Sequence, residues 1–271
     1  MIRFIPSLAL FLMAGVSTLR ADSTQLDLGY RQMYNLQFDD AHRTFQEWDR
    51  QHPEDPMGPV SQAAAYLFAE FDRLKILQSE FFSNDRKFLD GRSATPDPAL
   101  KAKFDSALEQ ARQRARAKLA RNPQDADATF AEILRLGLHS DYLALIERRY
   151  VPSLQETKTS RAMAEQLLAR NPEYSDAYLA IGVENYLLSL KSAPVRWMLR
   201  LGGAQTDQKA GIAKLQITAK RGRLLRPFAK LLLAVAAIRA KDRHGAREQL
   251  TELAADFPQN PLYREELARL E

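Results

Sequence analysis

The chain has 271 residues, of which 45% are hydrophobic and 27% charged, and its formal net charge is +5. This composition supplies enough apolar material for a buried core and excludes an intrinsically disordered chain. The chain contains no cysteine, which excludes disulfide scaffolds, thiolate zinc sites and cysteine-based catalysis. Its four histidines are scattered and lack metal-ligand spacing.

The first 21 residues have the pattern of a secretory signal peptide. Arg3 precedes an uncharged apolar run over 4–19, which is shorter than the roughly 20 residues needed to cross a bilayer. We expect cleavage after Ala21 and export to the periplasm, which leaves 22–271 with a formal net charge of +3. Leu19 stands where a small residue is usual, so an uncleaved N-terminal membrane anchor is the alternative.

From Thr24 onward the sequence predicts an all-α protein. Apolar residues recur at spacings of three and four, and the alternating β-branched runs typical of strands are missing. Most prolines fall between the helical segments, where proline starts or stops a helix.

A small residue followed twelve positions later by proline recurs four times. The pairs are Ala41 and Pro53, Ala111 and Pro123, Ser160 and Pro172, and Ala246 and Pro258. Four positions after each small residue, on the same helical face, stand Phe45, Ala115, Ala164 and Leu250. Small residues are needed where two antiparallel helices approach closely, so each pair predicts a helical hairpin that the proline ends.

Two of these copies also have identical residues at a constant offset of 49 positions. The segment 119–123 reads LARNP and is followed by Asp127, while 168–172 also reads LARNP and is followed by Asp176. An alanine follows each of these aspartates. Identity in a fixed register indicates an internal duplication.

The pattern resembles the tetratricopeptide repeat (TPR), a helix-turn-helix unit of about 34 residues. The first copy matches the family at Leu28, Gly29, Phe38, Ala41, Phe45 and Pro53. A later copy matches at Tyr178, Ile181 and Gly182, and the last copy at Ala246, Leu250 and Pro258. The resemblance implies a right-handed α-solenoid of about five hairpins over 22–271, with a concave face that binds peptide segments or proteins.

The repeat is irregular. The small positions Ala41, Ala111, Ser160, Gly211 and Ala246 are separated by 70, 49, 51 and 35 residues. We therefore expect inserted helices or loops at 72–100, 138–157 and 188–206. The segment 260–271 is predicted to be a capping helix, with Arg264, Glu265, Glu266 and Arg269 on its outer face.

The strongest charge feature is 191–230, where ten basic residues stand against one acid, Asp207. This segment includes Arg196, Arg200, Arg221 and Arg223. It predicts either a surface for an anionic membrane or envelope polymer, or a solvated helix face. Within it, the stretch around Trp197 is amphipathic and could lie at a membrane surface. The interpretation we favour packs Trp197, Met198 and Leu201 onto the neighbouring repeat.

Two further features have competing interpretations. Glu184 and Asn185 could point into the concave groove and bind a partner, or be solvated polar positions. The segment 63–82 is unusually rich in aromatic residues, which favours ordinary core packing over an aromatic ligand groove.

Catalytic signals are weak. Asp39 and Asp40 precede His42 at a helix start, where capping is favoured over metal binding. Glu132 and His139 share a helical face if the helix continues past Gly137, and Asp141 follows, but this is a weak acid–base candidate. The usual nucleophile, zincin and phosphate-loop motifs are missing from the sequence.

We therefore expect an exported, non-enzymatic TPR scaffold that mediates protein–protein interaction in the cell envelope and needs no cofactor. The alternative is a peripheral binder of anionic membrane or envelope polymer through 191–230. A nucleic-acid partner is not expected, because export separates the protein from nucleic acid.

Overall fold

The computed structural model describes residues 15–77, 95–190 and 193–271, and within these ranges the chain is helical without any strand. The helices are α1 (Gly15–Tyr34), α2 (Phe38–Gln51), α3 (Met57–Arg73), α6 (Pro98–Arg121), α7 (Ala126–Asp141), α8 (Tyr150–Arg170), α9 (Tyr178–Ser189), α10 (Ala193–Leu201), α11 (Gln208–Arg221), α12 (Arg226–Arg239), α13 (Arg243–Asp256) and α14 (Pro261–Arg269). A π-helical turn, η1 (Tyr142–Ile146), follows α7, and a 3-10 turn, η2 (Ser175–Ala177), precedes α9. The predicted all-α class is confirmed.

Short polar side chains begin many of these helices. The side chains of Asp97, Asp125, Asp207, Asp242 and Asn260 accept hydrogen bonds from backbone N–H groups in the first turns of α6, α7, α11, α13 and α14. These bonds satisfy donors that have no partner within the helix, so they define where each helix starts.

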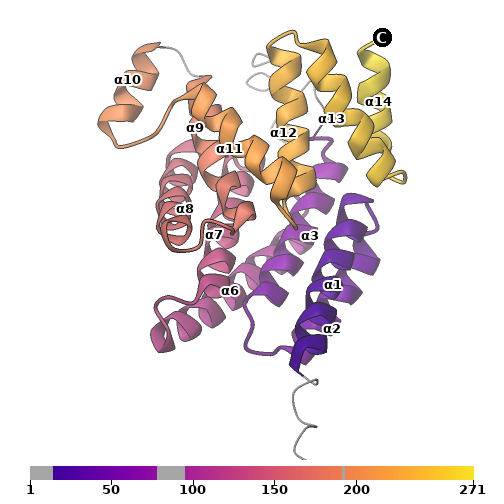
Figure 1. The fold of residues 1–271 in the computed structure, drawn as a ribbon, viewed down its shortest axis with the longest axis vertical. Coiled ribbons are helices and arrows are strands. Elements are labelled where there is room, and N and C mark those ends of the chain that lie inside the picture. Colours follow the sequence, from indigo (N-terminus) through magenta and orange to yellow (C-terminus); the bar gives the residue numbers. More distant parts are fainter. Residues whose placement is uncertain (1–14, 78–94, 191–192) are drawn as a thin grey trace, which may run out of the picture.

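Most helices pack against a neighbour in the chain as a pair (Figure 1). The pairs are α1 with α2, α3 with α6, α7 with α8, α9 with α11, and α12 with α13, after which α14 packs on α13. Each predicted small residue lies buried in the second helix of its pair. Prolines 53, 123, 172 and 258 each stand two positions after a helix end.

Close backbone approach explains the small residues. A Cβ atom on Gly211 would lie 2.6 Å from the backbone nitrogen of Tyr186, and one on Gly29 would lie 2.3 Å from the Phe45 ring. Gly182 is equally confined, since its Cβ would lie 2.9 Å from the Leu215 side chain. Leu28, in contrast, is 48% exposed and contributes little to the pairing of α1 with α2.

The predicted insertions take different forms. Part of 72–100, residues 78–94, lies outside the described residues. The segment 138–157 contains the end of α7, the turn η1 and the start of α8, while 188–206 contains α10.

The N-terminal prediction is only partly covered, because residues 1–14 lie outside the described ranges. Helix α1 begins at Gly15 and continues past Ala21, so cleavage there stays a prediction. Among the described helices, none combines the length and the apolar character required to span a membrane.

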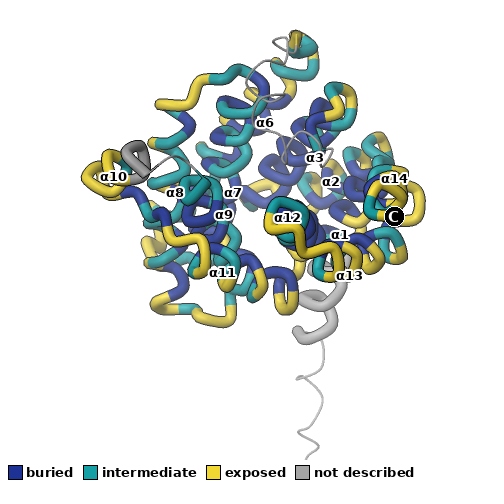
Figure 2. The backbone as a smooth tube through the Cα atoms, turned by 90° about the horizontal axis from the view of Figure 1, so that it is seen from above, coloured by how far each residue is buried: buried dark blue, intermediate teal, exposed yellow. Residues whose placement is uncertain are grey.

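The two ends of the array meet. The Asn260 side chain donates a hydrogen bond to the Tyr34 carbonyl at 2.9 Å, and the Gln259 N–H donates to the Asn35 side chain at 3.2 Å. The rings of Tyr34 and Phe257 are 5.5 Å apart. Figure 1 shows the start of α14 near the end of α1, and Figure 2, seen from above, shows α14 over the first hairpin, so the helices curl back on themselves.

The prediction that Glu266 lies on the outer face of the C-terminal helix is wrong. Glu266 is 2% exposed, and its carboxylate accepts a hydrogen bond from Arg269 at 2.7 Å. The reason is that the chain just before α14 is attached to α1, which leaves this part of α14 in the interior.

Two glycine substitutions test the packing. Gly211→Ala should lower the free energy of unfolding by about 1–3 kcal/mol, because the new Cβ collides with backbone that cannot move cheaply. Gly137→Ala is the matched control, since a Cβ on Gly137 meets no atom within 4 Å. It should raise stability by about 0.5–1 kcal/mol through helix propensity. Urea denaturation measures both, and equal effects of the two substitutions would contradict the packing described.

Candidate functional site

The first helices of the five pairs, α1, α3, α7, α9 and α12, surround a common pocket. The pocket holds about 770 Å³ of space not filled by atoms, its open mouth included. Apolar residues dominate its lining, among them Met33, Phe68, Ile133, Val183 and Phe228. No lysine, arginine or histidine belongs to the lining that the structure describes. We call this space the inner pocket.

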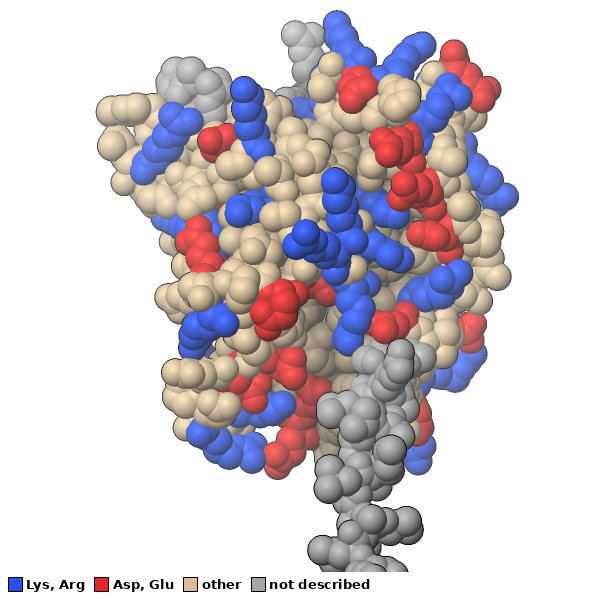
Figure 3. Space-filling view, in the orientation of Figure 1, with Lys and Arg blue, Asp and Glu red and all other residues tan. Residues whose placement is uncertain are grey.

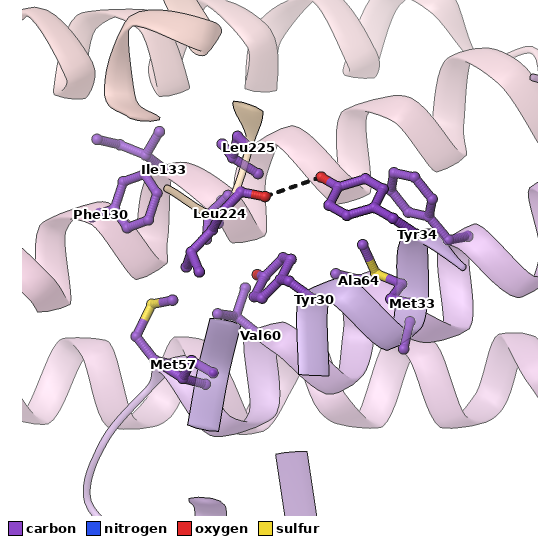
Figure 4. Packing of buried hydrophobic residues seen from close by; sticks show 14 of the residues in the cluster. Tyr30, Met33, Tyr34, Met57, Val60, Ala64, Phe130, Ile133, Leu224 and Leu225 are labelled. Atoms are coloured by element: carbon purple, nitrogen blue, oxygen red, sulfur yellow. Dashed lines mark hydrogen bonds between the residues drawn. The ribbon is translucent and has the colours of Figure 1, made fainter. Parts of the chain in front are cut away.

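Tyr30 and Tyr34 of α1 form one wall of the inner pocket (Figure 4). The Tyr34 hydroxyl donates a hydrogen bond to the Leu224 carbonyl at 3.2 Å, and the Tyr30 hydroxyl accepts one from Ser61 at 3.4 Å. Burial raises the pKa of Tyr30 to about 12, so this hydroxyl stays neutral. The two rings therefore present apolar faces, and their polar ends are already satisfied.

Asp176 lies at the pocket and has a structural role. Its carboxylate accepts hydrogen bonds at 3.0 Å from the backbone N–H groups of Arg223, Leu224 and Leu225. These bonds hold the connection between α11 and α12 so that Leu224 and Leu225 enter the interior (Figure 4). With its oxygens occupied in this way, Asp176 has little capacity for a ligand.

Asp141 is the exceptional group of the inner pocket. Asp141 ends α7 and is partly exposed to the pocket. Its side chain forms no hydrogen bond or ion pair with any described residue. Burial raises the pKa of its carboxyl group to about 7. The π-helical turn η1 follows it directly, and such turns are frequent at functional sites.

The hydroxyl groups near Asp141 are satisfied elsewhere. Ser140 donates to the Ser153 carbonyl at 3.1 Å and is 2.6 Å from the Thr157 hydroxyl, and Ser160 donates to the Ile133 carbonyl at 3.1 Å. Within the described part of the chain, the inner pocket thus has one polar side chain without a protein partner.

The predicted partner contacts at Glu184 and Asn185 are wrong, because both side chains are buried. Glu184 is 0% exposed, pairs with Arg161 at 2.7 Å and accepts from the Gln205 N–H at 3.0 Å. Asn185 accepts from the Asp207 N–H at 3.1 Å. Both residues hold the segment that follows α10 in place.

The favoured packing of α10 onto the neighbouring repeat is also wrong. Trp197, Met198 and Leu201 are 64%, 67% and 69% exposed, and α10 projects from the body of the molecule (Figure 1). The chain after α10 is anchored, since Lys158 donates to the Gly202 carbonyl and Arg161 to the Gly203 carbonyl.

The basic segment 191–230 does not form one patch. Arg200 donates to the Thr206 hydroxyl at 2.6 Å, and the Arg196 side chain lies outside the described residues. The exposed Arg221 and Arg223 stand at the far end of α11, a helix of 14 residues that is about 20 Å long. Arg223 pairs with Asp27 at 3.1 Å. Figure 3 shows Lys and Arg mixed with Asp and Glu on this face.

The prediction that Asp39 or Asp40 caps a helix is wrong as well. The N-cap of α2 is Gln37, whose side chain makes no capping bond, and the two aspartates lie in the first turn, where Asp40 pairs with Arg43. His42 contacts the Gln62 side chain at 2.5 Å.

The side chains of the acid–base candidate, Glu132, His139 and Asp141, do not contact one another. Glu132 pairs with Arg135 at 2.8 Å, and His139 pairs with Glu156 of α8 at 2.8 Å, while Asp141 lines the inner pocket. The described residues include no cluster of three or more histidine, aspartate or glutamate side chains that could hold a metal ion.

The favoured interpretation of the aromatic segment 63–82, core packing, holds for its described residues, while a ligand groove there stays a prediction. Phe71 is buried in the core, and Phe68 both packs against Phe228, at 5.6 Å between rings, and lines the inner pocket. Residues 78–82 lie outside the described ranges.

Sequence reasoning missed the isolation of Asp141. A signal was available, because Ile133, Leu134 and Leu138 make one face of this helix apolar, and Asp141 continues the same face. An acid on an otherwise apolar helix face is unusual and indicates either a buried pair or a ligand site.

Comparison with protein-family models, curated proteins and solved structures finds no match to this chain.

Asp141→Asn tests the isolation of this carboxyl group. Because its pKa in the folded protein lies above the unfolded value of 3.8, the folded state retains a proton that the unfolded chain releases. Stability should fall as the pH rises from about 4 to 7, and Asp141→Asn should remove this loss. At pH 8 we expect the variant to be more stable than the wild type by about 1–3 kcal/mol.

Urea titrations between pH 4.5 and 8 measure this difference. The exposed Asp39→Asn serves as the control and should follow the wild type at every pH. A variant curve parallel to the wild-type curve would show that Asp141 has a partner in solution.

Proposed function

We propose that this chain is an exported, non-enzymatic binding protein built from TPR-like hairpins, and that its inner pocket accepts an apolar segment of a partner protein. The observation that carries the proposal is that the first helix of every pair contributes to one apolar pocket. In a right-handed stack of TPR-like hairpins, the first helices line the concave face, which agrees with this placement.

The chemistry of the pocket favours binding over catalysis. Apolar pockets with a few fixed polar groups bury the anchoring side chains of a partner and so supply most of the affinity. In the described ranges Asp141 has no hydrogen bond to a hydroxyl, imidazole or amine that it could activate, and His139 is engaged by Glu156. Its surroundings therefore lack a nucleophile–base pair.

The N-terminal pattern supports the cell envelope as the place of action. The apolar run over 4–19 after Arg3 is typical of an export signal, and a chain without cysteine is compatible with an oxidising compartment.

Gly137→Leu tests the proposal by filling the inner pocket. A Cβ on Gly137 meets open space, so the larger side chain should fold without collision and occupy the pocket one helical turn before Asp141. The measurement is binding of the labelled mature protein to an array of short peptides. We expect peptides rich in Leu and Phe to bind the wild type and to lose at least tenfold in affinity with the variant.

Ala213→Leu, at an exposed position of α11, is the matched control and should bind as the wild type does. The proposal is wrong if Gly137→Leu and the wild type select the same peptides with the same affinity.

Helix α10 supports a second function, attachment to an anionic membrane surface. Exposed Trp197, Met198 and Leu201 could enter the boundary between headgroups and acyl chains, and Arg200 could attract anionic lipid. The buried ion pair between Arg161 and Glu184 helps to hold the base of this helix, which keeps its apolar side chains in solvent.

Co-sedimentation with vesicles tests this function. The wild type should bind phosphatidylglycerol vesicles at least fivefold better than phosphatidylcholine vesicles. Replacing Trp197, Met198 and Leu201 together by Ser should abolish binding, whereas Val151→Ser, at an exposed apolar position of α8, should not change it. Equal binding of both vesicle types, or unchanged binding of the triple variant, would rule out this role.

A further inference from the structure

The inner pocket has an electrostatic imbalance that the fold does not correct. Asp141 contributes a carboxylate, and no cationic side chain belongs to the described lining. Elsewhere in the interior, acids have partners: Glu184 pairs with Arg161 at 2.7 Å, and Glu70 pairs with Arg73 at 2.7 Å. Asp141 is only partly exposed, and a carboxylate against an apolar wall without a cation is costly, so it marks a position where a ligand can supply the charge.

The titratable groups around Asp141 do not provide that charge. The lining from α1 includes Tyr30 and Tyr34, and the turn before α9 provides Asp176, which is engaged by three backbone N–H groups. The lining from α3, α8, α9 and α12 contains no titratable side chain. On α7 itself, His139 is directed to Glu156 rather than to the pocket.

The apolar residues next to Asp141 form a strip along α7. Ile133, Leu134, Gly137 and Leu138 line the pocket over the two helical turns before Asp141, a length of about 12 Å. Gly137 keeps this stretch open, because a side chain there would project into empty space. An apolar stem with a positive end fits an apolar strip that leads to a single acid.

We infer that the inner pocket takes a lysine side chain of the partner segment, with the four-carbon stem against the apolar residues of α7 and the ammonium group at the carboxylate of Asp141. Lysine combines a flexible apolar stem with a compact charge, which matches an apolar strip that ends in one carboxylate. The inference rests on the proposed function of the pocket and specifies what the partner must carry.

Small-molecule probes test the lysine inference on the full mature protein. Calorimetric titration at pH 8 with n-hexylamine, n-hexanol and hexanoate compares a cation, a neutral group and an anion on the same stem. We expect hexylamine to bind at least tenfold more tightly than hexanol, and hexanoate to bind more weakly than either. Asp141→Asn should lower the affinity for hexylamine at least tenfold and leave the affinity for hexanol within a factor of two.

The pH dependence supplies a second readout. Hexylamine remains protonated between pH 5.5 and 8, so its affinity should rise with pH as Asp141 loses its proton and should level off above about pH 7. In Asp141→Asn the affinity should be independent of pH. A pocket that binds hexylamine by apolar contact alone would give no pH dependence in either protein, and this result would overturn the inference.

Two further comparisons distinguish failure of the lysine inference from failure of the proposed pocket function. Acetyl-Leu-Lys-Leu-amide should bind at least tenfold more tightly than its norleucine analogue, and binding of hexylamine without this preference would identify a free amine, not a lysine, as the occupant. If Gly137→Leu blocks hexanol but the wild type shows no preference for the amine, the lysine inference alone is wrong. If Gly137→Leu changes the binding of no probe, the proposed function of the pocket is wrong as well.

Discussion

The contact between Asp176 and the backbone of Arg223, Leu224 and Leu225 determines the shape of the whole array. Three N–H groups that bond one carboxylate hold the connection between α11 and α12 inside the molecule. Leu224 then lies within reach of Tyr34, whose hydroxyl bonds its carbonyl, and a contact across 190 residues is formed. Helix pairs that could have continued outward are turned back toward α1, and their apolar faces enclose a pocket.

The described acids that face the interior or the inner pocket are of two kinds. Glu184 and Glu70 each have an arginine and a backbone N–H as partners, and breaking such a group by removing one partner typically costs several kcal/mol. They stabilise the segments after α10 and before α6. Among the described residues Asp141 has neither an arginine nor a backbone donor as a partner, so it contributes nothing comparable to stability. The structure thus retains one acid at a thermodynamic loss, as sites for ligands often do.

The sequence was sufficient to predict the helices and their pairing, because both depend on local rules. The spacing from Ala41 to Pro53 and from Ala246 to Pro258 places a small buried residue and a helix end at fixed separation, and the structure has both. The roles of Glu184, Asn185 and Trp197 could not be predicted in this way. They depend on which helices meet after the chain curls, and no periodic pattern encodes that Glu184 faces Arg161 or that α10 projects. The inner pocket combines residues of six helices, from α1 to α12, so Asp141 could be recognised as an acid on an apolar face but not as an isolated one.

The bonds that join α1 to the chain before α14 also change how the molecule responds to stress. In an open array, terminal hairpins can fray while the middle remains folded, because each repeat contacts only its neighbours. Here Asn260 is bonded to the Tyr34 carbonyl across 226 residues, so neither end is free to open first. Contacts between residues this far apart must form late and at a high entropic cost. We therefore expect folding to be slower than in a simple stack of hairpins, and unfolding to be more cooperative than in an open array.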